Sequence, residues 1–207
     1  MGRPFFRRRL LLGAGLTCSL LLLHGGFVAS PDVHLVRQLL VSVAHGRLNG
    51  TNARPANPLD TAAMVRLMEP GDIVLCHNPR GAYGYWTHAV LYVGGGTIID
   101  SNDFVRGTVR KPLESYSSYN EVAVVRVKTS ARKRWQAARW ARGQVGRAYS
   151  PFSSLVDEHS EYCSKLVWEA FAKQNVIVAP RHHWLVPDDL AASARVKWIY
   201  RNPASPG

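Results

Sequence analysis

Residues 71–100 read GDIVLCHNPRGAYGYWTHAVLYVGGGTIID. The runs DIVLC, THAVLYVG and TIID are short, apolar and rich in β-branched residues, which is typical of β-strands. The glycines at 94–96 join the last two runs and indicate a hairpin. The run EVAVVRVK at 121–128 has the same character. The sequence therefore predicts an antiparallel sheet that begins near residue 72.

Helical patterns flank this predicted sheet. Asp60 is placed to cap a short helix that ends at Met68. After Thr129 the pattern becomes helical, with SARKRWQAARWARGQ capped by Ser130, followed further on by EYCSKLVWEAFAKQN. Strands followed by helices predict an α+β fold in which the helices pack on one antiparallel sheet.

The 207 residues suffice for one substantial core, and we expect a single folded domain over 59–200 with a tail at 201–207. Residues 1–30 join a basic start to the apolar run 10–23, which predicts a signal peptide or N-terminal membrane anchor. Residues 31–58 predict an amphipathic helix and a linker. We therefore expect an exported protein, periplasmic or anchored to the inner membrane.

The net charge of +12 favours anionic partners. The basic segment 128–147, with Trp135 and Trp140 interleaved, is of a kind that contacts nucleic acid. Because an exported protein does not meet DNA, we expect an anionic membrane surface or cell wall instead, and no nucleic acid. The sequence gives no indication of the oligomeric state.

Three residues could carry chemistry. Cys163 stands near the first turn of a predicted helix, where free backbone N–H groups and the helix dipole favour a thiolate. His88 begins a predicted strand and could be aimed at a facing helix, and Asp100 could return beside it across the hairpin to orient the imidazole. Taken singly, a buried thiol, a core histidine and a turn aspartate are the alternatives. A bridge between Cys76 and Cys163 is a further alternative.

Two segments together resemble a known family. VGRAYSPFSSLVDEHSEYCSKLV at 145–167 is similar to the Cys-Ser-x-Leu-Val signature of the NlpC superfamily of papain-like cell-wall peptidases and amidases. Residues 71–100 resemble its other half, a Gly-Asp strand followed by His-x-x-x-Tyr-x-Gly and a later polar residue. The histidine half comes first here, as it does in the circularly permuted branch of the YaeF and YiiX type.

This resemblance implies a permuted papain-like fold and a thiol hydrolase, an amidase, peptidase or esterase. Cys163 would be the nucleophile, His88 the base and Asp100 the orienting residue, with Ser101 and Asp103 as alternatives for the third role. The substrate-binding residues implied are Tyr149, Tyr92 and Ser164. Lys165 departs from the Glu or Gly of many relatives, so a shared substrate preference does not follow.

The expected substrate is an amide or ester, of a small molecule, a lipid or a cell-wall peptide. An acyltransferase using the same acyl-enzyme and a catalytically idle lipid- or peptide-binding relative are the alternatives. We expect no cofactor or metal, because Cys76, His77, His88, Cys163, His182 and His183 lack the spacing of common metal sites. Tyr83, Tyr85, Trp86, Phe104 and Trp168 would either line an acyl groove or fill the core.

Overall fold

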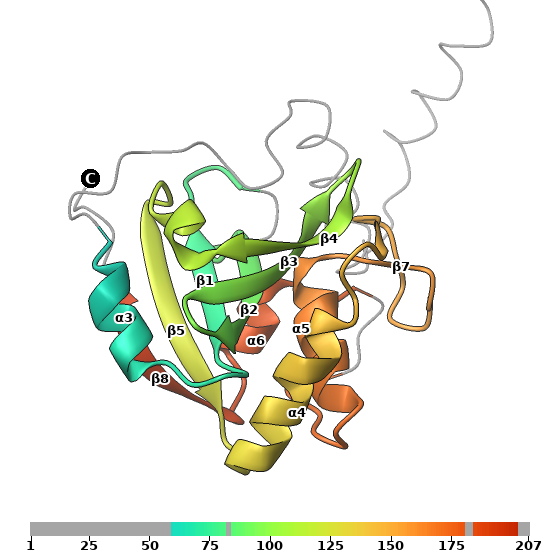
Figure 1. The fold of residues 1–207 in the computed structure, drawn as a ribbon. Helices are drawn as coiled ribbons and strands as arrows, with labels where there is room; N and C mark the ends of the chain where they lie inside the picture. Colours follow the sequence, from blue (N-terminus) through green and yellow to red (C-terminus); the bar gives the residue numbers. More distant parts are fainter. Residues whose placement is uncertain (1–58, 82–83, 181–183, 203–207) are drawn as a thin grey trace, which may run out of the picture.

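The computed structural model describes residues 59–81, 84–180 and 184–202 (Figure 1). The predicted signal peptide or anchor, the helix and linker that follow it, and residues 203–207 of the tail lie outside these ranges. Within them, no helix is both long and apolar enough to span a membrane.

Six strands form one antiparallel sheet in the order β4-β3-β2-β1-β5-β8. They are β1 (Ile73–His77), β2 (His88–Gly94), β3 (Thr97–Asp103), β4 (Gly107–Pro112), β5 (Glu121–Val127) and β8 (Val196–Asn202). The predicted runs correspond to β1, β2, β3 and β5, whereas β4 and β8 form the two edges. A separate parallel pair joins β6 (Ala148–Tyr149) to β7 (Ser160–Glu161).

Helices cover both faces of the sheet (Figure 1). They are α3 (Thr61–Leu67), the 3-10 helix η1 (Leu113–Tyr116), α4 (Ala131–Arg142), α5 (Cys163–Ala172) and α6 (Pro187–Ala191). The two predicted caps are present, since Asp60 accepts from the Ala63 N–H at 2.8 Å and Ser130 accepts from the Lys133 N–H at 3.3 Å. The α+β arrangement predicted from the order of strands and helices is confirmed.

The strand residues divide between two cores. Ile73, Leu75 and Leu91 pack with α4 and α5 on one face. Val74 and Val90 pack with α3 and η1 on the other. Because both faces are covered, the central strands are apolar throughout instead of alternating with polar residues.

The Gly-Asp pair at the start of β1 connects three elements. Gly71 has a φ of +93°, and an added Cβ would lie 2.5 Å from the Arg134 carbonyl oxygen of α4, so only glycine fits. Asp72 is fully buried and accepts two hydrogen bonds from the Arg126 guanidinium of β5, both at 2.7 Å. This pair therefore fixes the start of β1 against β5 and α4.

Arg126→Ala would leave the Asp72 carboxylate buried without its cation. We expect the free energy of unfolding to fall by about 3–5 kcal/mol, as measured by urea denaturation. The matched control is Arg106→Ala, whose arginine is 69% exposed in its pair with Asp103, so the loss should be at most about 1 kcal/mol. Equal losses would show that the buried pair contributes no more than a surface pair.

Candidate active site

His88 and Asp100 lie side by side on neighbouring strands. The register of β2 and β3 pairs Leu91 with Ile99 and Tyr92 with Ile98, which places both residues on the same face of the sheet. His88 Nε2 lies 2.9 Å from Asp100 Oδ1, and each side chain is only 1% exposed. This contact is an ion pair. The two atoms are close, but their geometry is not that of a hydrogen bond.

The second oxygen of Asp100 has two donors. Oδ2 accepts from Lys111 Nζ of β4 at 2.9 Å and from the Tyr116 hydroxyl of η1 at 2.5 Å. Burial acts to raise the pKa of Asp100, but the charge and hydrogen bond of His88, the Lys111 charge and the Tyr116 hydroxyl hold that pKa well below its usual range. Asp100 is therefore a carboxylate at neutral pH.

Two tyrosine rings stack near the imidazole. The ring centroids of Tyr116 and Tyr119 lie 5.9 and 6.2 Å from that of His88, and each ring is tilted by only 8° from it. The two tyrosines restrict the rotation of the imidazole while its edge faces Asp100. Sequence reasoning missed both of them, because the segment LESYSSYN at 113–120 carries no pattern that points to His88.

Cys163 is the first residue of α5, which packs against β2 and α4. The N-cap residue, Tyr162, forms no side-chain capping bond, and the first turn contains no acidic residue. The free N–H groups and the positive end of the helix dipole therefore act on the Cys163 sulfur without a competing side chain. The Cys163 side chain is buried, with 5% of the residue exposed.

The imidazole connects the thiol to the carboxylate. Because Nε2 faces Asp100, Nδ1 is the nitrogen left for Cys163, and no other described group satisfies it. Burial acts to lower the pKa of His88, but the negative charges of Asp100 and of a Cys163 thiolate outweigh it and raise that pKa. The site can hold an imidazolium between two anions, as a cysteine nucleophile with a histidine base requires.

Residues 67–206 match the family described as permuted papain-like amidase enzymes, YaeF/YiiX, C92 family. The chain belongs to this family. At the family level the protein is therefore a papain-like cysteine peptidase or amidase, and the predicted permuted papain-like fold is confirmed.

A solved structure supports the same fold. The crystal structure of the metalloprotein yiiX from Escherichia coli O157:H7 is similar to this permuted amidase, with a TM-score of 0.53 and 13% sequence identity. The match covers 65% of this chain and 97% of that one. Among curated proteins, none matches the sequence.

The alternatives for the third residue of the permuted amidase have other partners. The Ser101 hydroxyl donates to the Glu161 carbonyl oxygen at 3.2 Å. Asp103 pairs with Arg106 in the turn between β3 and β4. Asp100 is thus the one of the three candidates whose carboxylate contacts His88.

The predicted substrate-binding residues occupy different surroundings. Tyr92 is 2% exposed, and its hydroxyl accepts from the Gly96 N–H at 3.1 Å. The Ser164 hydroxyl donates to the Leu185 carbonyl oxygen at 2.7 Å. Tyr149 is half-buried on β6, and its ring meets that of Phe104 edge to face at 4.8 Å. Of these three side chains, Tyr149 has the most exposed setting.

Lys165, which departs from the family motif, is buried behind Cys163. Its ammonium donates to Ser153 Oγ at 2.8 Å, to the Ser160 carbonyl at 2.7 Å and to the Asp157 carbonyl. Burial lowers the pKa of Lys165, and the charge of Glu169 opposes that effect. The side chain therefore ties the segment before Cys163 to α5.

The second thiol near the site, Cys76, lies in the core. Cys76 and Cys163 are both free, and Cys76 is fully buried opposite His88 in the β1–β2 register. Burial, together with the charges of Asp100 and Cys163, raises the pKa of Cys76 well above its usual value.

The aromatic residues that could line an acyl groove divide between core and surface. Trp86 and Trp168 lie in the core, Tyr85 and Phe104 are exposed, and Tyr83 lies outside the described residues.

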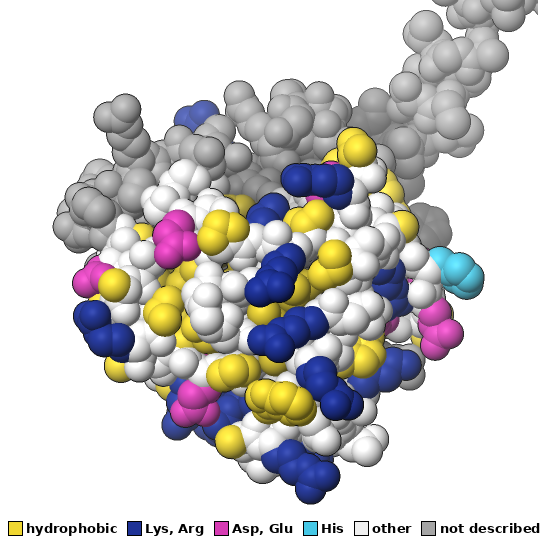
Figure 2. All heavy atoms as spheres, viewed as in Figure 1, with side chains coloured by type: hydrophobic (Ala, Val, Ile, Leu, Met, Phe, Trp, Pro, Cys, Tyr) yellow, Lys and Arg dark blue, Asp and Glu magenta, His cyan; other side chains and the backbone are white. Residues whose placement is uncertain are grey.

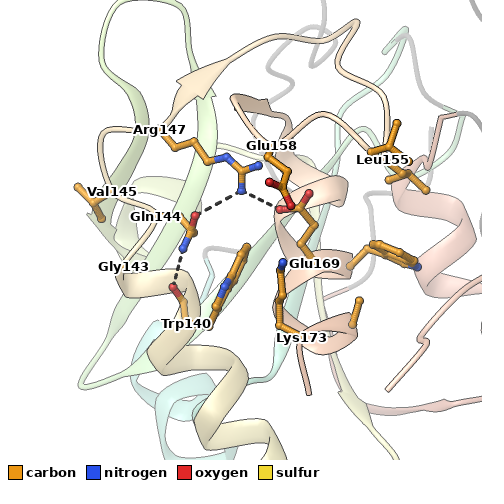
Figure 3. A pocket seen from close by; sticks show the side chains of 12 residues that line it. Trp140, Gly143, Gln144, Val145, Arg147, Leu155, Glu158, Glu169 and Lys173 are labelled. Atoms are coloured by element: carbon orange, nitrogen blue, oxygen red, sulfur yellow. Dashed lines mark hydrogen bonds and ion pairs between the residues drawn. The ribbon is translucent and has the colours of Figure 1, made fainter. Parts of the chain in front are cut away.

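Other candidate ligand sites lie apart from the thiol. Within the described ranges, no group of three His, Cys, Asp or Glu residues is arranged to hold a metal, and His182 and His183 fall outside them. A cavity of about 740 Å³ opens between α4, α5 and the segment 143–158, where Arg147 bonds Glu169 at 2.7 Å and Gln144 at 3.3 Å (Figure 3). Its lining does not include the residues of the candidate site.

Asp100→Asn would remove the charge that stabilises the imidazolium. We expect the pKa of His88 to fall, so its NMR titration midpoint should move about 1–3 pH units lower. The matched control, Asp103→Asn, changes a carboxylate at the end of the same strand that pairs with Arg106 instead of His88, and it should leave the midpoint in place. An unchanged midpoint in Asp100→Asn would show that the carboxylate does not set the protonation of His88.

Proposed function

We propose that this permuted amidase is a thiol hydrolase in which Cys163, His88 and Asp100 cleave an amide or ester. The observation that supports this most is the buried contact of 2.9 Å between His88 and Asp100, beside a cysteine at the start of a helix. A structural histidine would not need a buried, charged carboxylate beside its imidazole. The family match supports the cysteine chemistry, and the three roles and the substrate are our proposal.

In this proposal, the Cys163 thiolate attacks the carbonyl carbon and forms a tetrahedral intermediate. The bond from carbon to the leaving nitrogen or oxygen then breaks, and the His88 imidazolium gives its proton to the leaving group. Water attacks the resulting thioester, His88 takes a proton from this water, and the acid is released as the thiolate re-forms. Asp100 keeps its charge throughout and stabilises the imidazolium.

The start of α5 supports the charge that develops on the carbonyl oxygen. Backbone N–H groups of the first turn lack a capping side chain, so they can donate to an oxyanion near Cys163. We propose that Tyr149 helps to bind the substrate, because it is half-buried and contacts Phe104, which is 67% exposed. This apolar contact suits the acyl part of a lipid amide or ester, and a cell-wall peptide is the second substrate class.

We expect Cys163→Ala to abolish hydrolysis, and His88→Ala to lower kcat on the order of 10⁴-fold or more. Amine or alcohol release from a panel of N-acyl lipids, lipid esters and muropeptides measures the effect. Circular dichroism of each variant controls for folding. Hydrolysis that persists in Cys163→Ala would exclude the thiol mechanism.

Covalent probes separate the substrate classes and the alternatives. An acyl-vinylsulfone on a lipid or a muropeptide scaffold should label Cys163 and not Cys76, which peptide mass spectrometry distinguishes. Labelling by muropeptide probes alone would remove the lipid preference. Labelling that is unaffected by His88→Ala, without turnover, would support an idle binding relative. Transfer of the acyl group to an added amine in preference to water would identify an acyltransferase.

A further inference from the structure

The outer face of α4 carries a stripe of exposed arginines around a tryptophan. The residues are Arg132, Trp135, Arg139 and Arg142, spaced so that they share one side of the helix. The opposite side places Ala137, Ala138 and Ala141 in the core. The helix is therefore anchored by its small residues and presents Arg132 and Arg139 outward.

Trp135 and the stripe arginines are not engaged by acidic side chains. Trp135 is 50% exposed, and the Arg139 guanidinium lies 5.6 Å from the centroid of its ring. Among the residues that the structure describes, no carboxylate forms an ion pair with Arg132, Arg139 or Arg142. The Arg142 guanidinium donates to the Val93 carbonyl oxygen of β2, so the charges available to an external partner are those of Arg132 and Arg139.

The stripe continues onto the edge strand. Arg110 of β4 is exposed and pairs in register with Ile99, whose side chain lies on the α4 side of the sheet. The chain after α4 bonds to β4 through Gly146 N–H to the Thr108 carbonyl at 2.8 Å. Figure 2 shows Lys and Arg side chains in a column on this face, from the β3–β4 hairpin down to α4, with acidic side chains at its margins.

We propose that this surface, defined as Arg110, Arg132, Trp135 and Arg139 and called the basic face, docks on an anionic lipid bilayer. A convex helix with arginines around a single half-exposed tryptophan suits a headgroup layer, where the indole lies at the interface and each cation meets phosphate. Each arginine near such a surface strengthens binding about fivefold. This docking is independent of the proposed catalysis.

A bilayer fits the basic face better than nucleic acid does. Stacking on bases requires an open aromatic face, whereas Arg139 already lies over the Trp135 ring. Val145, 51% exposed, follows the stripe in the next turn and adds an apolar group that can enter the interface. The apolar run 10–23 of the same chain, with its arginines, is also suited to a membrane.

Photocross-linking tests where the full chain meets lipid. Benzoylphenylalanine replaces Trp135 in one variant and Trp198 of β8, which is 47% exposed, in the control. With vesicles of phosphatidylcholine and phosphatidylglycerol, we expect at least about fivefold more lipid adduct at position 135. Equal adducts at the two positions would overturn the proposal, and so would adducts at position 135 to an added DNA duplex in preference to lipid.

Charge variants test the same surface without a probe. The ratio of partition coefficients for anionic and neutral vesicles cancels the apolar contribution of residues 1–30, and comparison of this ratio with that of the unaltered chain cancels the contribution of their arginines, which all variants share. We expect this ratio to fall about 25-fold in Arg132→Gln/Arg139→Gln. It should fall less than about threefold in Arg66→Gln/Lys197→Gln, which loses the same charge from the α3 side of the sheet. Equal falls would show that only net charge matters.

Discussion

The carboxylate of Asp100 is buried against the sheet. Side chains from three elements compensate its charge: His88 of β2, Lys111 of β4 and Tyr116 of η1. A buried charge that lost one of these partners would destabilise the fold strongly. Each donor reaches Asp100 only if its own element is in register, so the edge of the sheet from β2 to η1 is arranged around one carboxylate. The orientation of the imidazole follows from that arrangement, and the chemistry depends on it.

A second polar network holds the segment around Cys163 from behind. Lys165 binds the segment before Cys163, and Arg147 bonds Glu169 of α5 at 2.7 Å and Glu161 of β7 at 3.4 Å. Burial raises the pKa of Glu161 to about 7, against the Thr108 hydrogen bond and the Arg147 charge. The Thr108 hydroxyl of β4 donates to the Glu161 carboxylate and the Ser101 hydroxyl of β3 donates to the Glu161 carbonyl oxygen, so the network behind Cys163 is joined to the strands that hold Asp100 and Lys111.

The sequence predicted the interior better than the edges. Runs of β-branched residues identified β1, β2, β3 and β5, because strands covered on both faces are apolar throughout. β4 and β8 carry charged and exposed residues, and only pairing with β3 and β5 makes them strands. At the site, motif spacing pointed to Cys163, His88 and Asp100. Lys111, Tyr116 and Tyr119 could not be predicted, because tertiary packing alone brings Lys111 to the Asp100 carboxylate and the two tyrosines to the imidazole.

The order of the two halves along the chain has a consequence for the newly made protein. Synthesis from the N-terminus produces the strands that hold His88 and Asp100 before the helix that begins with Cys163. The last strand, β8, then completes the sheet beside β5. A polypeptide released before α5 contains His88 and Asp100 but lacks Cys163. Under the proposed roles, the site is therefore completed by the later of the two halves, which here is the one that carries Cys163 at the start of α5.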